Sequence, residues 1–129
     1  MVTLAPERNG ALAEIEQIVD AGVIAAAGHT EATYEQTRAA IAAGATVGTH
    51  LFNAMRPIDR REPGPVIALL EEPRVTVELI ADSVHVDPAI FRHSTSVNRS
   101  SSRRFRANSV VRSEESALGE VRTTRSMHY

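Results

Sequence analysis

The sequence predicts an α/β protein with a parallel sheet, followed by a segment of different character. Short apolar runs alternate with amphipathic stretches through residues 1–91, and glycines stand where helices would end. The charge then changes sign: residues 1–91 carry 13 acidic residues against 6 arginines, whereas residues 92–129 carry 8 arginines against 3 acidic residues. We therefore expect two parts, a folded part at 1–91 and a Ser/Arg-rich tail at 92–129.

The composition excludes several classes of protein. The chain has no cysteine, which rules out disulfides and thiolate metal sites. No apolar run approaches the ~20 residues of a membrane span, and the N-terminus lacks a basic region followed by an apolar one. We expect a soluble, cytoplasmic protein with no membrane partner.

Strands are expected at residues 2–5, 23–27, 45–49 and 75–81. Pro6 ends the first because proline cannot donate to a strand ladder. The second is a continuous apolar run between Gly22 and Gly28, typical of a strand buried on both faces. The last is rich in β-branched residues.

Helices are expected at residues 9–21, 31–43 and 64–70, with a fourth beginning at Pro88. The first shows helical spacing of Leu12, Ile15 and Ile18. Thr30 is the expected N-cap of the second, and Asp87 that of the fourth. This order predicts parallel strands joined by helical crossovers, as in a doubly wound sheet or a (β/α)₈ barrel. A complete barrel needs ~250 residues, so four strands could not close one.

The pattern is lost from residue 93 onward, where serine and arginine dominate. Low hydrophobicity with charge of one sign favours a disordered tail. Arginine-rich segments also bind nucleic acid through phosphates. No aromatic or repeated pattern supports that alternative here, and we expect no nucleic-acid partner.

Three histidines each follow a predicted strand: His29, His50 and His85. Ligands bind at the carboxyl ends of parallel strands, and adjacent strands lie about 5 Å apart. Two imidazoles there can hold one divalent metal, and zinc or another borderline divalent ion suits them. The alternative for each histidine is a structural residue held by hydrogen bonds.

Two further segments leave alternatives open. Asp82 could orient a histidine, bind a sugar hydroxyl or cap the loop that follows it. The turn at residues 60–64 offers arginines beside free helix-terminal amides, which suits a phosphate. A solvated charged loop explains the same residues.

Five segments together resemble the N-acetylglucosamine-6-phosphate deacetylases of the amidohydrolase superfamily. They are Val-Thr-Leu-Ala-Pro-Glu at 2–7, Gly-His-Thr at 28–30, Thr-His-Leu-Phe-Asn-Ala-Met at 49–55, Arg-Glu-Pro-Gly at 61–64 and Glu-Leu-Ile-Ala-Asp-Ser-Val-His-Val at 78–86. The order and spacing match over residues 2–91. The resemblance implies an incomplete (β/α)₈ barrel of about four βα units.

The resemblance also implies an enzyme of amino-sugar catabolism. Family members hydrolyse N-acetylglucosamine 6-phosphate to glucosamine 6-phosphate and acetate with a divalent metal, and the parent family is expected to be homo-oligomeric. The matching positions assign the metal to His29 and His50, and the substrate to Asn53, Ala54, Arg61 and His85.

Departures from the family pattern predict that this chain is inactive alone. The family's metal-binding glutamate lies upstream of Val2, and nothing in residues 92–129 matches its catalytic aspartate, so no catalytic residue is identified. Ser83 replaces a usual glycine. A frameshift near Arg92 would produce the abrupt break. The alternative to the family enzyme is a non-catalytic truncated product or interaction fragment.

Overall fold

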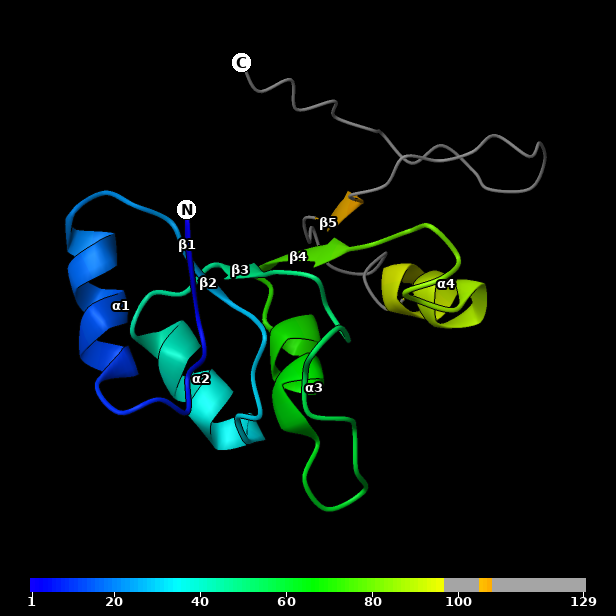
Figure 1. Ribbon diagram of the computed structural model, residues 1–129, viewed down its shortest axis with the longest axis horizontal. Helices are drawn as coiled ribbons and strands as arrows, with labels where there is room; N and C mark the ends of the chain where they lie inside the picture. The colour runs from blue at the N-terminus through cyan, green and yellow to red at the C-terminus, as the bar shows by residue number, and fades with distance from the viewer. Residues whose placement is uncertain (97–104, 108–129) are drawn as a thin grey trace.

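The computed structural model describes residues 1–96 and 105–107, which form one parallel sheet (Figure 1). Each strand pairs with the next one in the chain, in the order β1-β2-β3-β4-β5. A doubly wound sheet reverses its strand order at a switch point, whereas a barrel does not. The strands are β1 (Val2–Leu4), β2 (Ala25–Ala27), β3 (Val47–Gly48), β4 (Thr76–Leu79) and β5 (Phe105–Ala107).

The helices cover one side of this sheet. Figure 1 shows α1, α2 and α3 arranged along the same side of the strands, and α4 adds Phe91 to the core between sheet and helices. Strand β3 packs closely against α3, because a Cβ atom on Gly48 would lie 3.0 Å from the Leu69 side chain. The helices are α1 (Ala11–Asp20), α2 (Tyr34–Ala42), α3 (Gly64–Glu71) and α4 (Pro88–Ser96).

Sequential strand order with helices on one side is the arrangement of a (β/α)₈ barrel. The predicted fold class, an incomplete barrel of about four βα units, is confirmed. Four strands each precede a helix, and β5 follows the last one. Of the range 92–129, the structure describes the end of α4 and β5. The predicted disorder of the rest lies outside the described residues.

Two local predictions are wrong. The N-cap of α2 is Thr33, whose side chain accepts a bond from Gln36 N at 3.1 Å while Gln36 bonds back to Thr33 N. Thr30 instead closes a turn of its own by accepting from Ala32 N at 3.0 Å. The strand at 23–27 is buried only over its three alanines, and Ile24 remains 50% exposed beside β1.

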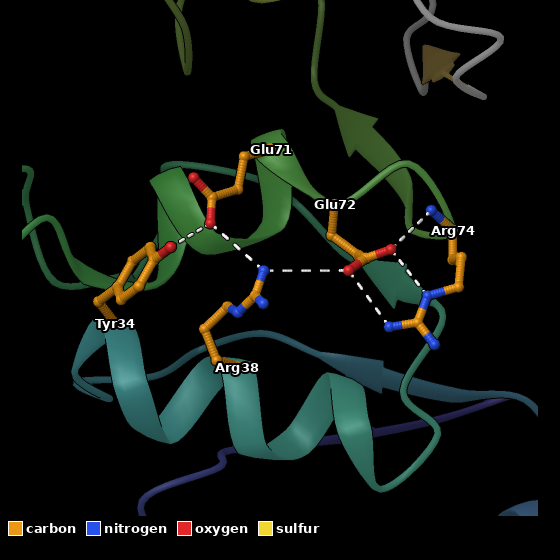
Figure 2. Close-up of polar contacts among 5 residues, drawn as sticks. All are labelled: Tyr34, Arg38, Glu71, Glu72 and Arg74. Carbon is orange, nitrogen blue, oxygen red and sulfur yellow. Dashed lines mark hydrogen bonds and ion pairs between the residues drawn. The ribbon is translucent and has the colours of Figure 1, made fainter.

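A chain of charged contacts joins α2 to the end of α3 (Figure 2). Glu72 accepts from Arg74 Nε at 2.8 Å and from Arg74 Nη2 at 3.2 Å. Arg38 Nη1 lies 3.4 Å from Glu71 Oε1, and the Tyr34 hydroxyl donates to the same carboxylate. The bonds from Arg74, together with the positive charges of Arg74 and Arg38, lower the pKa of Glu72 to about 2. The network therefore secures the turn that leads into β4.

Candidate metal and substrate site

His29 and His50 are brought together at the carboxyl ends of β2 and β3. The two strands pair through Ala27 and Gly48, and each reaches its histidine two residues later. Thr49 N still donates to Ala27 O at 3.0 Å, which keeps the chains in register beyond the strands. The imidazole centroids lie 5.9 Å apart, with the ring planes at 84°. Two histidines distant in sequence thus form one pair.

The backbone around this pair is strained. Among the residues that the structure describes, five other than glycine have a positive φ, and all follow β2, β3 or β4. Left-handed conformations cost a non-glycine residue roughly 1–2 kcal/mol each and concentrate at functional sites. They are His29 (φ 49°), His50 (φ 50°), Phe52 (φ 76°), Ala54 (φ 48°) and Ser83 (φ 61°).

The histidine pair fits two ligands of a metal ion. His50 Nδ1 is buried and has no hydrogen-bond partner among the described residues. A buried polar atom left in this way costs roughly 1–3 kcal/mol, which coordination or a bound ligand would offset. In the described part of the chain, no group of three or more histidine, aspartate or glutamate residues could hold a metal. The two imidazoles here are therefore fewer than the three or four protein ligands of a typical zinc site.

The loop after β3 folds back across the end of β2. Leu51 is fully buried and its N–H donates to Glu78 O of β4 at 2.8 Å. Asn53 Nδ2 donates to Leu51 O at 3.3 Å, which holds its side chain inside the loop. Arg56 N then donates to Thr30 O at 2.9 Å, next to His29. Asn53 and the exposed Ala54 therefore lie in a loop that follows His50 and ends beside Thr30, the residue after His29.

The turn at residues 60–64 was predicted to offer both arginines and free helix-terminal amides to a phosphate, and the structure differs in the amides. Arg61 is exposed, and its N–H donates to Asp59 Oδ1 at 2.9 Å. The amide of Gly64, at the start of α3, is not free for a phosphate because it donates to Glu62 Oε1 at 3.1 Å. The same oxygen accepts from Tyr34 N, the first residue of α2, at 2.6 Å. Glu62 thus accepts from the first amide of both helices, and the exposed Arg61 side chain is the group of this turn that could pair with an anion.

His85 is tied to its own loop rather than to the other histidines. It lies six residues beyond the end of β4, and its Nδ1 is 2.6 Å from Asp82 Oδ2. The other oxygen of Asp82 accepts from the N–H groups of Val84 and His85, both at 2.9 Å. Two of the roles considered for Asp82, orienting a histidine and capping the loop, are therefore both fulfilled.

A buried polar contact on the side of the sheet away from the helices was not predicted from the sequence. Gly48 faces α3, so its neighbour Thr49 faces the opposite way, as strand alternation requires. Thr49 Oγ1 donates to Glu78 Oε2 at 2.8 Å, and both side chains are buried. Glu78 is the one charged residue in the apolar run at 75–81, and this position in the sequence could have indicated a buried polar contact.

Glu7 makes a second contact that the sequence analysis missed. It follows β1, and its carboxylate accepts hydrogen bonds from Glu31 N at 2.9 Å and from the Thr30 hydroxyl. Burial opposes its ionisation, but these two bonds prevail and lower the pKa of Glu7. The loop that carries His29 is thereby anchored to β1.

A fold of sequential βα units with two histidines at adjacent strand ends is typical of metal-dependent hydrolases built on barrels. Residues 2–123 match the amidohydrolase family, and the chain belongs to that family. No helix in the described part of the chain has the length and apolar character needed to cross a membrane.

The relatives are more specific than the family. The chain is 48% identical over 88 residues to N-acetylglucosamine-6-phosphate deacetylase of Vibrio furnissii, covering 68% of this chain and 22% of that protein. It is 47% identical over 89 residues to N-acetylgalactosamine-6-phosphate deacetylase of Escherichia coli O157:H7, covering 69% and 24%. The predicted resemblance to these deacetylases is confirmed.

Solved structures agree with this placement. The crystal structure of N-acetyl-D-glucosamine-6-phosphate deacetylase from Mycobacterium smegmatis is 77% identical and superposes with a TM-score of 0.74, covering 74% of this chain and 25% of that one. A mutant of that enzyme is known in complex with N-acetyl-D-glucosamine 6-phosphate. This chain spans about a quarter of the length of the relatives that it matches.

Proposed function

We propose that this chain carries part of an active site for metal-dependent hydrolysis of N-acetylglucosamine 6-phosphate to glucosamine 6-phosphate and acetate. The observation that carries the proposal is the pair of imidazoles, 5.9 Å apart, whose His50 Nδ1 is buried without a partner among the described residues. The 77% identity to a deacetylase of this substrate supports the choice of reaction.

His29 and His50 would hold the metal, for which zinc suits imidazole ligands. When bound, the ion supplies an activated water and polarises the acetamide carbonyl. The other residues bind and orient the substrate. The Arg61 guanidinium would pair with the phosphate, Asn53 and Ala54 would contact the sugar, and His85 would donate to the carbonyl oxygen.

We further propose that the chain has no turnover alone. Amide hydrolysis needs a group that takes a proton from water and delivers it to the leaving nitrogen. No residue of this chain matches the family's aspartate, and Asp82 is already engaged by three hydrogen-bonding atoms. Loss of a general base lowers the rate by about 10²–10⁴.

The metal part of the proposal is tested by titrating the purified chain with zinc against a chromophoric chelator. His50→Ala should weaken zinc binding by more than about 10-fold, since even loss of a residue that supports a ligand costs 10- to 100-fold. His93→Ala is the matched control, because His93 is exposed on α4 and should leave the affinity unchanged. Equal affinities for the chain and His50→Ala would refute the site.

The reaction is tested by measuring acetate release from N-acetylglucosamine 6-phosphate with zinc present. The galactosamine epimer is included because one relative is named for that substrate. We expect no release by this chain together with zinc binding that depends on His50. Turnover abolished by His50→Ala would support the reaction but contradict the predicted inactivity.

A second candidate is a non-catalytic fragment that associates with other chains. The apolar side chains beside edge strand β1 favour it, since Val2 is 41% exposed and Ile24 50% exposed. A chain that binds no zinc and sediments as a concentration-dependent assembly would favour this candidate over the metal site. The predicted cytoplasmic location and the homo-oligomeric parent remain part of the first proposal.

A further inference from the structure

The carboxylate of Asp82 has two separate tasks, one for each oxygen. Oδ1 accepts from Val84 N and His85 N, both at 2.9 Å, and closes the loop in which Ser83 adopts a φ of 61°. Oδ2 lies 2.6 Å from His85 Nδ1. The His85 side chain is otherwise half exposed. One contact therefore shapes the backbone while the other holds the ring.

The ring contact determines which nitrogen of His85 carries the proton. An ionised carboxylate only accepts hydrogen bonds, so the nitrogen facing it must be protonated. Bonds from the His85 and Val84 amides lower the pKa of Asp82 to about 2, which keeps it ionised at neutral pH. A neutral His85 then has its hydrogen on Nδ1 and a lone pair on Nε2, whereas the imidazolium form donates from both nitrogens.

We propose that Asp82 is a positioning residue that holds His85 as its Nδ1–H tautomer and leaves Nε2 as the ring atom that meets the substrate. The use of Nε2 rests on the proposed deacetylase function. A donor to a carbonyl oxygen must carry hydrogen on Nε2, and with Nδ1–H committed to Asp82 only the imidazolium form provides it. In the proposed reaction, His85 would therefore donate to the carbonyl oxygen only as the imidazolium form, because its neutral form carries no hydrogen on Nε2.

The two tasks can be separated by Asp82→Asn. The amide keeps one oxygen, which can still accept from the Val84 and His85 N–H groups. It places an NH₂ group, which only donates, opposite His85 Nδ1. The neutral ring must then accept at Nδ1 and move its hydrogen to Nε2. Asp82→Ala removes both tasks and serves as the comparison for loss of the loop cap.

The experiment is a long-range ¹H–¹⁵N correlation of the imidazole rings in the labelled chain at about pH 8, above the ordinary histidine pKa of about 6.5. His85→Gln identifies the signals. We expect a protonated Nδ1 and an unprotonated Nε2 in the unaltered chain, and the reverse in Asp82→Asn. The Val84 and His85 amide signals should stay near their positions in Asp82→Asn and move in Asp82→Ala. An Nε2–H tautomer in the unaltered chain, or the same tautomer in Asp82→Asn, would overturn the proposal.

Addition of N-acetylglucosamine 6-phosphate with zinc separates this inference from the proposed function. A shift of the His85 Nε2 signal supports both. The expected tautomer with no shift on addition of the substrate retains Asp82 as the positioning residue and refutes the substrate role of Nε2.

Discussion

Among the glycines of the described residues, Gly28 is the one where an added methyl group should lower the stability most, because it has the least space for a Cβ atom. A Cβ atom built there would lie 2.5 Å from Thr49 Cγ2 and 3.2 Å from both Thr49 O and Thr3 Cγ2. The next residue is His29, and Thr49 directly precedes His50. Gly28→Ala therefore adds one methyl group between the two strands that carry the histidine pair.

The loss of stability in Gly28→Ala depends on how firmly Thr49 is held in place. Its Oγ1 donates to the buried Glu78 carboxylate at 2.8 Å, so rotation away from the new methyl would break that bond. Overpacking costs typically 1–3 kcal/mol, and leaving a buried acceptor unpaired costs a similar amount. Because the structure will take the cheaper of the two, we expect Gly28→Ala to lower the free energy of unfolding by about 2 kcal/mol.

Urea unfolding of a double-mutant cycle tests this reasoning. Thr49→Ser removes the clashing Cγ2 but keeps the hydroxyl, so Gly28→Ala should cost much less in that background. We expect a coupling energy of at least about 1 kcal/mol. Gly22→Ala is the control: nothing lies within 4 Å of its Cβ, and its φ of 73° adds only backbone strain. Costs that are additive within about 0.5 kcal/mol would refute the clash with Thr49.

Two further predictions concern stability. Ser83→Gly should raise the free energy of unfolding by up to about 1 kcal/mol, because Ser83 holds a φ of 61° that glycine adopts without strain; an unchanged urea midpoint would contradict this. Glu72→Gln should cost about 1 kcal/mol at pH 7, a modest value since the Arg74 side chain is 68% exposed. The pKa of Glu72 is lowered to about 2, so its contribution is complete above the ordinary carboxyl pKa of about 4.5 and is lost as the pH falls through about 2. Unfolding measured from pH 5 to pH 2 should therefore depend less on pH in Glu72→Gln, and identical profiles would refute the contact.

Most of the local structure was predictable because it depends on neighbours in the sequence. Gly22 and Gly44 do end α1 and α2 with positive φ, and Asp87 caps α4 by accepting from Ala89 N at 2.7 Å. The N-cap of α2 was misplaced because two threonines, Thr30 and Thr33, precede the helix. Thr33 is distinguished by Gln36, three residues later, which completes the capping box, whereas Thr30 donates to Glu7, 23 residues earlier.

The sequence predicted which residues form the candidate site, but not the hydrogen bonds around them. The position of each histidine after a strand indicated that His29 and His50 share an edge of the sheet, and the centroid distance of 5.9 Å agrees. The Thr49–Glu78 contact could not be derived, because it depends on the register of β3 against β4 and on which face each residue occupies. The same register decides what surrounds Gly28.

By itself the sequence determined the rhythm of strands and helices, the ends of most of them and the motif segments shared with the deacetylases, since all of these lie within a few residues of chain. The order of strands and helices left a barrel and a doubly wound sheet open; the tertiary structure confirmed the barrel that the resemblance implied, through sequential strand pairing with the helices on one side. It alone revealed β5, which pairs with Val77–Leu79 from within an arginine- and serine-rich segment. It also gave Asp82 two tasks and removed the Gly64 amide from the anion site. The pairing of β5 joins residues far apart in the sequence, whereas the contacts of Asp82 and Gly64 are local but depend on loop conformations that the sequence pattern did not predict.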